Sequence, residues 1–321
     1  MRRLGFGIAV IVLLATAGSF VFADIWYFDV LASLRLQLLI ACAALCLLAL
    51  LLGSRRTSAV LAAAVLLNGF PVARAALQSP PPPPAMAAHD VSILFYNTAR
   101  RTVDLFEFRA FVRARQPDVL ALTEVFAWNI ADIRRTFPEF PYSVGEPGVF
   151  GAVILSRTPI RDFRIHEHAG GPSGRTLGIR LCGKLDADKC MALLVLHPPP
   201  PLSADYHRLR DQQIMAAAMQ AGMASEERAV SGRVAMIGDF NLTPWNAVYH
   251  KSLKAGGLAD AFAGGPPHST WFSTFAAAGL AIDHVWLGPG LGIRRVDIGP
   301  PTGSDHFAVY VELAVDVDLR W

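Results

Sequence analysis

The sequence predicts an α/β protein in which mixed β-sheets pack together and carry helices on their outer faces. From about Asp90 onward, eight short apolar segments follow one another, and helical patterns separate only some of them. Consecutive strands without an intervening helix argue against a doubly wound parallel sheet and for packed mixed sheets. Hydrophobic residues are concentrated in the first 78 residues, which predict a membrane anchor ahead of this domain.

Composition narrows the class of protein only after these two parts are separated. Across the 321 residues, 53% are hydrophobic and 17% are charged, against about 25% charged in typical globular chains. The net charge of +3 is small. It neither requires nor excludes an anionic partner, and it does not by itself indicate nucleic-acid binding.

The expected elements of the globular domain follow from short apolar runs and one amphipathic pattern. We expect helices at Leu105–Arg115 and Ala204–Met223, the second with apolar residues spaced among Arg and Gln. The expected strands are Val91–Tyr96, Val119–Thr123, Ala152–Ser156, Leu177–Leu181, Met191–Leu196, Val234–Ile237, Ile282–Leu287 and Phe307–Leu313.

Three apolar runs make up the predicted anchor, residues 1–78. They are Leu4–Ala23, Gln37–Gly53 and the shorter Ala59–Val72. A bilayer core takes roughly 20 helical residues, so we expect about three transmembrane helices. The alternative for the first run is a signal peptide, since it has a basic start and small residues near its end. Two further apolar runs follow at once, which favours the anchor.

Basic residues predict the orientation of the anchor. Arg2 and Arg3 precede the first run, and Arg55 and Arg56 lie between the second and third. Such clusters stay in the cytoplasm, so three spans place the rest of the chain on the other side. The stretch Asp24–Leu36 then faces outward. Its aromatic residues suit the membrane interface, and we expect a short helix lying on the membrane there.

A proline-rich linker, residues 79–89, separates the anchor from the domain at residues 90–321. Pro80–Pro84 predict a stiff extended spacer of about 3 Å per residue.

Polar residues follow or interrupt the apolar strands of the domain. Each has an ordinary explanation as a turn former, helix cap or solvated side chain. Together they supply oxygen ligands, a His–Asp pair and an Asp–Asn pair, the parts for metal-assisted phosphoester hydrolysis, and the ends of strands are where rigid sheets hold ligand sites. These residues are Asn97, Glu124, His197, Asp239, Asn241, Asp283, His284, Asp305 and His306.

The same residues, in this order, resemble those of the endonuclease/exonuclease/phosphatase superfamily. The matching stretches run from "YNTAR" and "LTEV" through "GAVILSRTPI" and "LHPPPP" to "GDFNLTPW", "IDHVW" and "GSDHFAVYV". The resemblance implies a four-layer, DNase I-like α/β sandwich of two mixed sheets flanked by helices. The anchored arrangement looks like that of bacterial members, which implies a multi-pass protein of the inner (plasma) membrane.

The resemblance also implies the roles of the site residues. Glu124 is expected to be the principal Mg²⁺ ligand, with Asn97 and Asp305 completing or supporting the site; Mn²⁺ is an alternative ion. Asp239 is expected to orient and help deprotonate the attacking water. Asn241 is expected to hold the nucleophile or a phosphate oxygen.

Two histidines and an arginine complete the implied machinery. His306 is expected to act as general base or proton donor, with Asp283 fixing its tautomer. His197 is expected to hydrogen-bond a phosphoryl oxygen. Arg175 precedes a strand where relatives often carry a phosphate-contacting Arg. Thr176 follows it in place of the acid found in DNase-like relatives, which weakens a DNase I-type assignment.

Neighbouring aromatic residues have simpler expectations. Phe240 lies between two site residues and should point away from the site into apolar neighbours. Trp271 resembles either a substrate-side or a packing tryptophan, and we favour packing.

The four cysteines divide into two pairs. Cys42 and Cys46 lie in the second apolar run and are most simply small apolar residues. Cys182 and Cys190 flank a predicted hairpin connection. If the domain faces an oxidising compartment, they are expected to form a cross-strand disulfide.

The sequence therefore predicts a membrane-tethered, Mg²⁺-dependent phosphoesterase with its catalytic domain outside the cytoplasm. Two substrate classes stay open, nucleic acid and a phospholipid or small phosphodiester. Arg100, Arg101, Arg134 and Arg135 are the candidates for a nucleic-acid groove. The alternative is a non-catalytic, membrane-anchored binding domain that retains the fold. Beyond the bilayer and the substrate, no protein partner is predicted.

Overall fold

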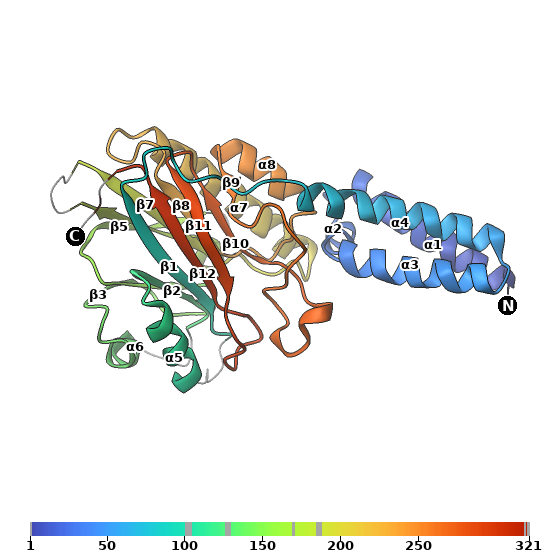
Figure 1. Ribbon diagram of the computed structural model, residues 1–321, viewed down its shortest axis with the longest axis horizontal. Coiled ribbons are helices and arrows are strands. Elements are labelled where there is room, and N and C mark those ends of the chain that lie inside the picture. Colours follow the sequence, from blue (N-terminus) through green and yellow to red (C-terminus); the bar gives the residue numbers. More distant parts are fainter. Residues whose placement is uncertain are drawn as a thin grey trace.

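The molecule is elongated, with a helical bundle at one end and an α/β domain at the other (Figure 1). A computed structural model of the chain describes residues 2–99, 105–125, 130–168, 171–183, 188–317 and 319. The N-terminus lies at the end of the bundle farthest from the domain.

Two six-stranded mixed sheets form the centre of the domain. The first has the order β11-β12-β1-β2-β4-β3, and the second has the order β5-β6-β7-β8-β10-β9. Only the neighbours β1/β2 and β7/β8 are parallel. The strands are β1 (His89–Asn97), β2 (Val119–Thr123), β3 (Tyr142–Gly145), β4 (Ala152–Ser156), β5 (Ile160–Glu167), β6 (Arg175–Cys182), β7 (Cys190–Leu196), β8 (Val234–Asp239), β9 (Ala259–Asp260), β10 (Asp283–Leu287), β11 (Leu291–Ile298) and β12 (Val309–Val315).

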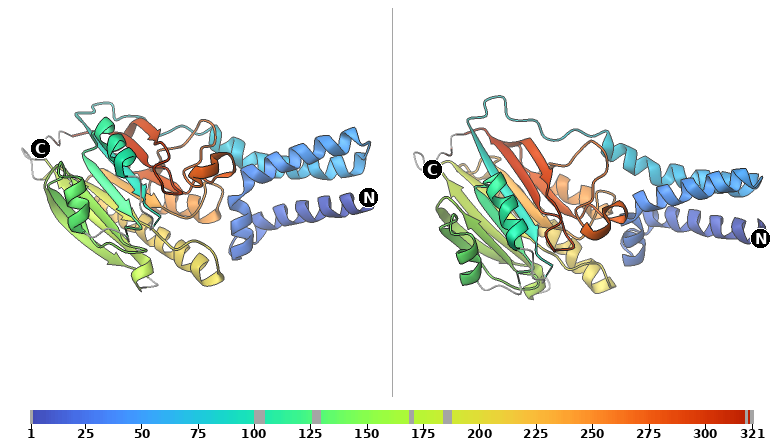
Figure 2. Two further views of the ribbon diagram at one scale, coloured as in Figure 1. Left: turned by 90° about the horizontal axis from the view of Figure 1, so that it is seen from below. Right: turned by 60° about the horizontal axis from the view of Figure 1, so that its bottom comes forward.

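The sheets pack face to face and helices cover their outer faces, giving four layers (Figure 2). Every second side chain of each sheet points into the space between the two sheets and fills it. Phe95, Leu193 and Val285 are examples, and all three are fully buried. Burying one such side chain contributes about 1.5–3 kcal/mol. Helices α5 (Leu105–Arg115) and α6 (Ile130–Thr136) pack on the first sheet. Helices α7 (Ala204–Glu226) and α8 (Ala247–Gly256) pack on the second.

All eight expected strands and both expected helices of the domain are present, and the four-layer sandwich is confirmed. The elements that the sequence reading missed are β3, β5, β9, β11, α6 and α8, together with the 3-10 turns η1 (Gly171–Gly174) and η2 (Ser273–Ala278). These elements are short or lie at exposed sheet edges. In β5, for example, four charged side chains replace the continuous apolar run that marks a buried strand.

In the described part of residues 1–78, the predicted anchor forms four helices. They are α1 (Arg2–Val21), α2 (Trp26–Ser33), α3 (Arg35–Leu51) and α4 (Arg55–Ala76). In the described part of the chain, α1 and α4 are each long and apolar enough to cross a membrane, whereas α3 qualifies only together with α2, across a 69° bend. Two spans therefore stand on length and composition, and the expected third depends on this bent pair. Helix α2 is the short helix expected between the first two runs.

The proline-rich linker lies against the domain. The backbone N–H of Ile293 in β11 donates to the carbonyl of Pro81 at 3.0 Å. A Cβ at Gly292 would lie 2.2 Å from the carbonyl oxygen of Pro82, so only glycine permits this approach. The linker thus covers the outer edge of β11 along part of its length.

Cys182 and Cys190 form the expected disulfide. They are directly opposite each other in the antiparallel register of β6 and β7. Cys42 and Cys46 are free thiols in α3.

Candidate active site at the strand ends

Strand register gathers the polar residues that are distant along the chain. In the parallel pair β1/β2, Asn97 is opposite Thr123, so Glu124 follows at the same edge. In the parallel pair β7/β8, Leu196 is opposite Gly238, which places His197 next to Asp239. Parallel strands present their carboxyl ends at one edge, so two pairs deliver four polar side chains to one place.

Gly238 allows β8 to approach β7 at this edge. Its φ is 158°, and a Cβ there would lie 1.9 Å from the carbonyl oxygen of Leu196. A side chain at this position would push Asp239 away from His197.

Asn97, Glu124 and Asp239 form a hydrogen-bonded group. The side-chain N–H₂ of Asn97 donates to Glu124 Oε1 at 3.2 Å and to Asp239 Oδ2 at 3.0 Å. Its own Oδ1 accepts from the backbone N–H of Ala99 at 2.9 Å. Asn97 therefore bridges two carboxylates in this structure, and its amide nitrogen faces the centre of the site.

His306 and Asp283 form a buried pair beside Asp239. The carboxylate of Asp283 lies 3.0 Å and 3.1 Å from Nδ1 of His306. The other ring nitrogen, Nε2, is 3.6 Å from Asp239 Oδ2. Asp283 reaches this position because β10 pairs with β8 and places it opposite Asp239. We define the edge cluster as Asn97, Glu124, His197, Asp239, Asp283 and His306.

Burial and crowding of carboxylates shift the pKa values of the edge cluster. Burial raises the pKa of Asp239 well above its ordinary value, and the charge of Asp283 adds to the rise while His306 opposes it. For His306, burial alone would lower the pKa. The carboxylates of Asp283 and Asp239 outweigh it and raise the pKa of the ring to about 9. The ring of His306 therefore carries a proton at neutral pH.

His197 is the opposite case. Burial lowers the pKa of its ring to about 4, although the nearby Glu124 opposes the shift. Its Nδ1 lies 3.0 Å from the carbonyl oxygen of Val149. That contact favours the tautomer with hydrogen on Nδ1. The lone pair of Nε2 then faces Glu124 Oε1 at 3.4 Å and Asp239 Oδ2 at 3.5 Å.

Asp305 and Trp271 lie at the same cavity. The indole N–H of Trp271 donates to Asp305 Oδ2 at 3.2 Å. The other carboxylate oxygen, Oδ1, is buried with no hydrogen-bond partner in the described part of the chain. Trp271 therefore does more than pack, because it orients a carboxylate in the cavity wall.

Asn241 holds the loop after β8 in a left-handed conformation with φ 51°. Its backbone N–H donates to Asp239 Oδ1 at 2.9 Å, and its side-chain N–H₂ donates to the carbonyl of Pro198 at 3.0 Å. Glu124 has a similar φ of 53°. Such backbone strain in non-glycine residues is concentrated at functional sites.

A cavity of about 600 Å³ opens over the edge cluster. This size is typical of small-molecule sites. Among the residues that the structure describes, none that lines the cavity is Lys or Arg. The lining residues are Val30, Ser33, Leu34, Ala99, Glu124, His197, Pro200, Pro201, Leu202, Asp239, Asn241, Trp271, Leu280, Ile282, Asp305 and His306.

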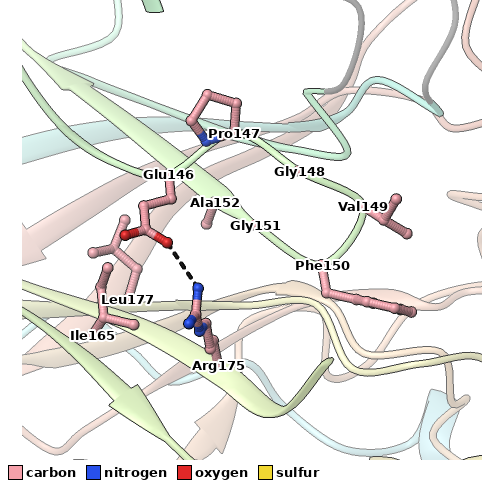
Figure 3. A pocket seen from close by; sticks show the side chains of 10 residues that line it. All are labelled: Glu146, Pro147, Gly148, Val149, Phe150, Gly151, Ala152, Ile165, Arg175 and Leu177. Atoms are coloured by element: carbon pink, nitrogen blue, oxygen red, sulfur yellow. Dashed lines mark hydrogen bonds and ion pairs between the residues drawn. The ribbon is translucent and has the colours of Figure 1, made fainter. Parts of the chain in front are cut away.

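Arg175 does not line this cavity. It lies at a separate pocket of about 220 Å³, where it pairs with Glu146 at 2.8 Å (Figure 3). It also pairs with Glu167 at 2.7 Å. The loop of that pocket includes Phe150, whose ring centre lies 5.8 Å from that of His197. The predicted contact of Arg175 with phosphate stays a prediction, and it requires this arginine to leave both carboxylates.

Two residues point away from the site, as strand alternation requires. Phe240 is fully buried and packs edge-on against Trp286. His284 is also buried, and its Nε2 contacts the carbonyl of Leu242 at 2.8 Å. His284 therefore belongs to the core under α8.

Ser304 belongs to the site although it is not among the site residues that the sequence predicts. Its hydroxyl donates to the carbonyl of Asn97 at 2.7 Å and accepts from the backbone N–H of His306 at 3.0 Å. This side chain fastens the His306 loop to the end of β1. The sequence signal that could have indicated Ser304 is its position in the motif "GSDH", two residues before His306.

The fold and these motifs define the class of protein. The model of the endonuclease/exonuclease/phosphatase family matches residues 93–306, and the chain belongs to that family of phosphoester hydrolases. The match spans Asn97 to His306, the first and last residues of the edge cluster.

Solved structures of the family share the fold at low sequence identity. A family protein from Bacteroides thetaiotaomicron matches with TM-score 0.57 and 15% identity, covering 71% of this chain and 96% of its own. The human Nocturnin catalytic domain with bound sulfate has TM-score 0.56 and 16% identity, covering 70% and 93%. D. rerio TDP2 complexed with a single-strand DNA product matches with TM-score 0.54 and 15% identity, covering 70% of this chain and 98% of its own. No curated protein sequence matches the chain.

Proposed function

We propose that this chain is a membrane-tethered, divalent-metal-dependent phosphoesterase that uses Mg²⁺, with Mn²⁺ as the alternative ion. The observation that carries the proposal is the continuous chain of contacts from Asp283 through His306 to Asp239, beside Glu124 in one cavity. A proton-holding pair next to a group of oxygen ligands is the equipment of metal-assisted hydrolysis.

The residues present fit a divalent cation. Glu124, His197 and Asp239 each offer a ligand atom, and the three atoms lie within 4.8 Å of one another. The lone pair of neutral His197 faces two carboxylates, an arrangement that a cation between them would stabilise. Carboxylate oxygens are what Mg²⁺ prefers, and the unpartnered Oδ1 of Asp305 adds a further acceptor at the cavity. When bound, the ion would neutralise charge that develops on the phosphate oxygens.

The protein groups would handle the proton and the geometry. Asp239 is proposed to accept a hydrogen bond from the attacking water and align it toward phosphorus. His306, held by Asp283 through Nδ1, presents Nε2 to the cavity and exchanges a proton with the water or the phosphate. Asn97 keeps the two carboxylates of Glu124 and Asp239 at a fixed separation.

Three further roles are proposed from position. Asn241 closes the loop that carries Asp239 and lines the cavity, so it is placed to contact a phosphate oxygen. His197 would donate to a phosphoryl oxygen only as an imidazolium, because its Nδ1 already faces a carbonyl, and that role excludes the cation-ligand role of its neutral form. Arg175 is proposed to reach the phosphate after release from Glu146 and Glu167.

We also propose that the domain lies outside the cytoplasm of a bacterial inner membrane. The support is the placement of the basic pairs around α1, α3 and α4, and the disulfide between Cys182 and Cys190. Alkylation of the native membrane protein without reductant should leave Cys182 and Cys190 unmodified. Modification of both thiols would contradict the proposed side.

The test of the activity uses the full chain in detergent. Hydrolysis of chromogenic phosphodiester and phosphomonoester substrates should require Mg²⁺ or Mn²⁺ and stop with EDTA. Asp239→Asn and His306→Ala should each lower kcat by about 10³-fold or more. Asp205→Asn, the same chemical change at an exposed position on α7, is the control and should retain full activity. Binding of phosphoesters without turnover would favour the alternative, a non-catalytic binding domain.

A further inference from the structure

We propose that the cavity receives the headgroup of a glycerophospholipid whose chains remain in the bilayer that holds the anchor. This inference rests on the proposed phosphoesterase activity and names its substrate class. It arises from the fact that the anchor supplies part of the cavity wall.

Helix α2 of the anchor lines the same cavity as the edge cluster. Val30, Ser33 and Leu34, at its end, line the cavity together with Asp239 and His306. Residues of the connection between α1 and α3 can therefore contact a ligand bound in the cavity.

Buried polar contacts hold α2 in this place. Asp29 pairs with Arg210 of α7 at 2.7 Å, and both side chains are almost completely buried. The hydroxyl of Ser33 donates to Asn246 Oδ1 at 3.0 Å, and Asn246 Nδ2 donates to the carbonyl of Asp29 at 2.9 Å. We define the docking cluster as Asp29, Ser33, His207, Arg210, Asp211 and Asn246. Buried hydrogen bonds and ion pairs require specific partners, so they fix where α2 lies on the domain as well as keeping it buried.

The same helix marks the level of the membrane surface. Helix α1 ends at Val21 and α3 begins at Arg35, so α2 joins them at the end of the bundle that faces the domain (Figures 1 and 2). Helix α4 also ends there, at Ala76. An aromatic-rich connection between apolar helices belongs at the headgroup level of the bilayer. The cavity wall formed by α2 therefore lies at that level.

Exposed apolar side chains lie next to cavity-lining residues of the domain along the chain. Leu202, which lines the cavity, is 74% exposed, and Tyr206 follows at the start of α7. Trp271 also lines the cavity, and the exposed side chains of Phe272 and Phe275 follow it; Phe275 is 61% exposed. We call Leu202, Tyr206, Phe272 and Phe275 the apolar rim. Exposed apolar side chains beside a polar cavity suit contact with lipid.

The segment that carries two rim residues is tied to the anchor. The side-chain N–H₂ of Gln37 in α3 donates to the carbonyl of Gly279 at 2.7 Å. On its other side, the backbone N–H of Ser273 donates to the carbonyl of Asp305 at 2.8 Å. Phe272 and Phe275 thus lie on a bridge between the anchor and the site.

The described lining of the cavity lacks the row of cations that a nucleic-acid strand requires, whereas a lipid headgroup presents a single phosphate. Strand-binding grooves need cations along the phosphate backbone, and the described residues lining this cavity include neither Lys nor Arg. Of the predicted groove arginines, Arg134 and Arg135 lie on α6 and do not line the cavity. Arg100 and Arg101 lie outside the described residues.

The experiment uses the full chain reconstituted into phosphatidylcholine vesicles with Mg²⁺. Phosphatidic acid and phosphatidylglycerol, a phosphomonoester and a phosphodiester, are placed either in the same bilayer or in separate protein-free vesicles. Glycerophosphate, glycerophosphoglycerol and plasmid DNA are the soluble comparisons. We expect hydrolysis of at least one lipid, at a rate that follows its mole fraction in the protein's own bilayer. Equal rates on separate vesicles, or faster cleavage of a soluble comparison, would overturn the inference.

Substitutions in the apolar rim test the surface itself. Phe275→Asp and Leu202→Asp should lower the ratio of lipid to chromogenic-substrate turnover by about tenfold, the scale of losing one apolar side-chain contact. Phe163→Asp, an equally drastic change at an exposed ring on β5, is the control and should leave that ratio unchanged. Equal ratios in rim and control variants would overturn the inference. Cleavage of the chromogenic substrate without lipid cleavage would refute the lipid assignment alone, whereas loss of all cleavage would refute the phosphoesterase proposal as well.

Discussion

The edge cluster and the docking cluster are both buried and polar, yet they differ in charge balance. In the docking cluster, Arg210 lies between Asp29 and Asp211, and each of its three nitrogens has a hydrogen-bond partner. The edge cluster brings Glu124, Asp239 and Asp283 together, with histidines as its only cationic groups.

This difference separates a structural polar cluster from a functional one. A buried ion pair with satisfied hydrogen bonds resists separation, because losing one partner leaves a bare charge. Crowded, buried carboxylates are unfavourable in their charged form, and a cation or a proton among them lowers their free energy. The docking cluster joins α2 to α7, and the edge cluster is the proposed metal site.

The largest expected effect is in the docking cluster. Asp29→Asn removes the more buried of the two carboxylates that pair with Arg210 and leaves Asp211 as the remaining charged partner, so it should lower the free energy of unfolding by about 3 kcal/mol. Denaturation of the full chain in detergent, followed by tryptophan fluorescence, measures it. The control is Asp205→Asn, because the exposed pair of Asp205 with Arg208 contributes at most about 1 kcal/mol. If Asp29→Asn and Asp205→Asn lower the free energy of unfolding equally, the buried ion pair of the docking cluster is no more stabilising than an exposed one.

Metal binding should stabilise the edge cluster specifically. At about a hundredfold excess over its Kd, Mg²⁺ should raise the free energy of unfolding by about 2.7 kcal/mol. The same titration should give a much smaller shift in Asp239→Asn, because one proposed ligand is lost. If the variant responds to Mg²⁺ as the unmodified chain does, the ion binds elsewhere.

The metal-free protein should lose stability as the pH rises from about 6.5 to about 9. The pKa of His306 is raised from 6.5 to about 9, and that of Asp239 is also raised, so the folded state binds more protons than the unfolded state. The contribution of His306 is fully present below its unfolded pKa of 6.5 and declines by about 1.4 kcal/mol per pH unit through this range, whereas the contribution of Asp239 already begins to decline above the ordinary pKa of a carboxyl group, 3.8. Denaturation in EDTA across this range measures the slope. Saturating Mg²⁺ should flatten it, and a flat slope without metal would contradict the pKa shifts.

The smallest expected effect has the opposite sign to the first. Asp239→Asn removes a buried carboxylate whose charged form is unfavourable without metal, so it should raise the free energy of unfolding in EDTA by about 1 kcal/mol. The same change therefore stabilises one cluster and destabilises the other. A loss of stability in Asp239→Asn would show that Asp239 is needed for the fold as much as for the site.

Prediction from sequence succeeded where the signal is local. Strands such as Val119–Thr123 carry continuous apolar runs. The site residues can be recognised in the sequence because they are polar residues that follow or interrupt such runs. It failed where burial is partial, as in β5 and β11, because several charged residues in these strands make them resemble loops in the sequence. Arg175 shows a second limit. Its position in the chain matched the family pattern, while its ion pairs depend on Glu146, 29 residues away.

The sequence alone determined the apolar helices, the buried strands and the identities of the polar residues at the strand ends, because each follows from neighbours along the chain. Tertiary structure decided which of these residues meet. Strand register placed Asp283 opposite Asp239, and a contact 181 residues apart joined Asp29 to Arg210. Local periodicity carries no record of such pairings, since they arise from sheets and helices packing together. For that reason only the three-dimensional structure shows that Val30, Ser33 and Leu34 of the predicted anchor line the cavity.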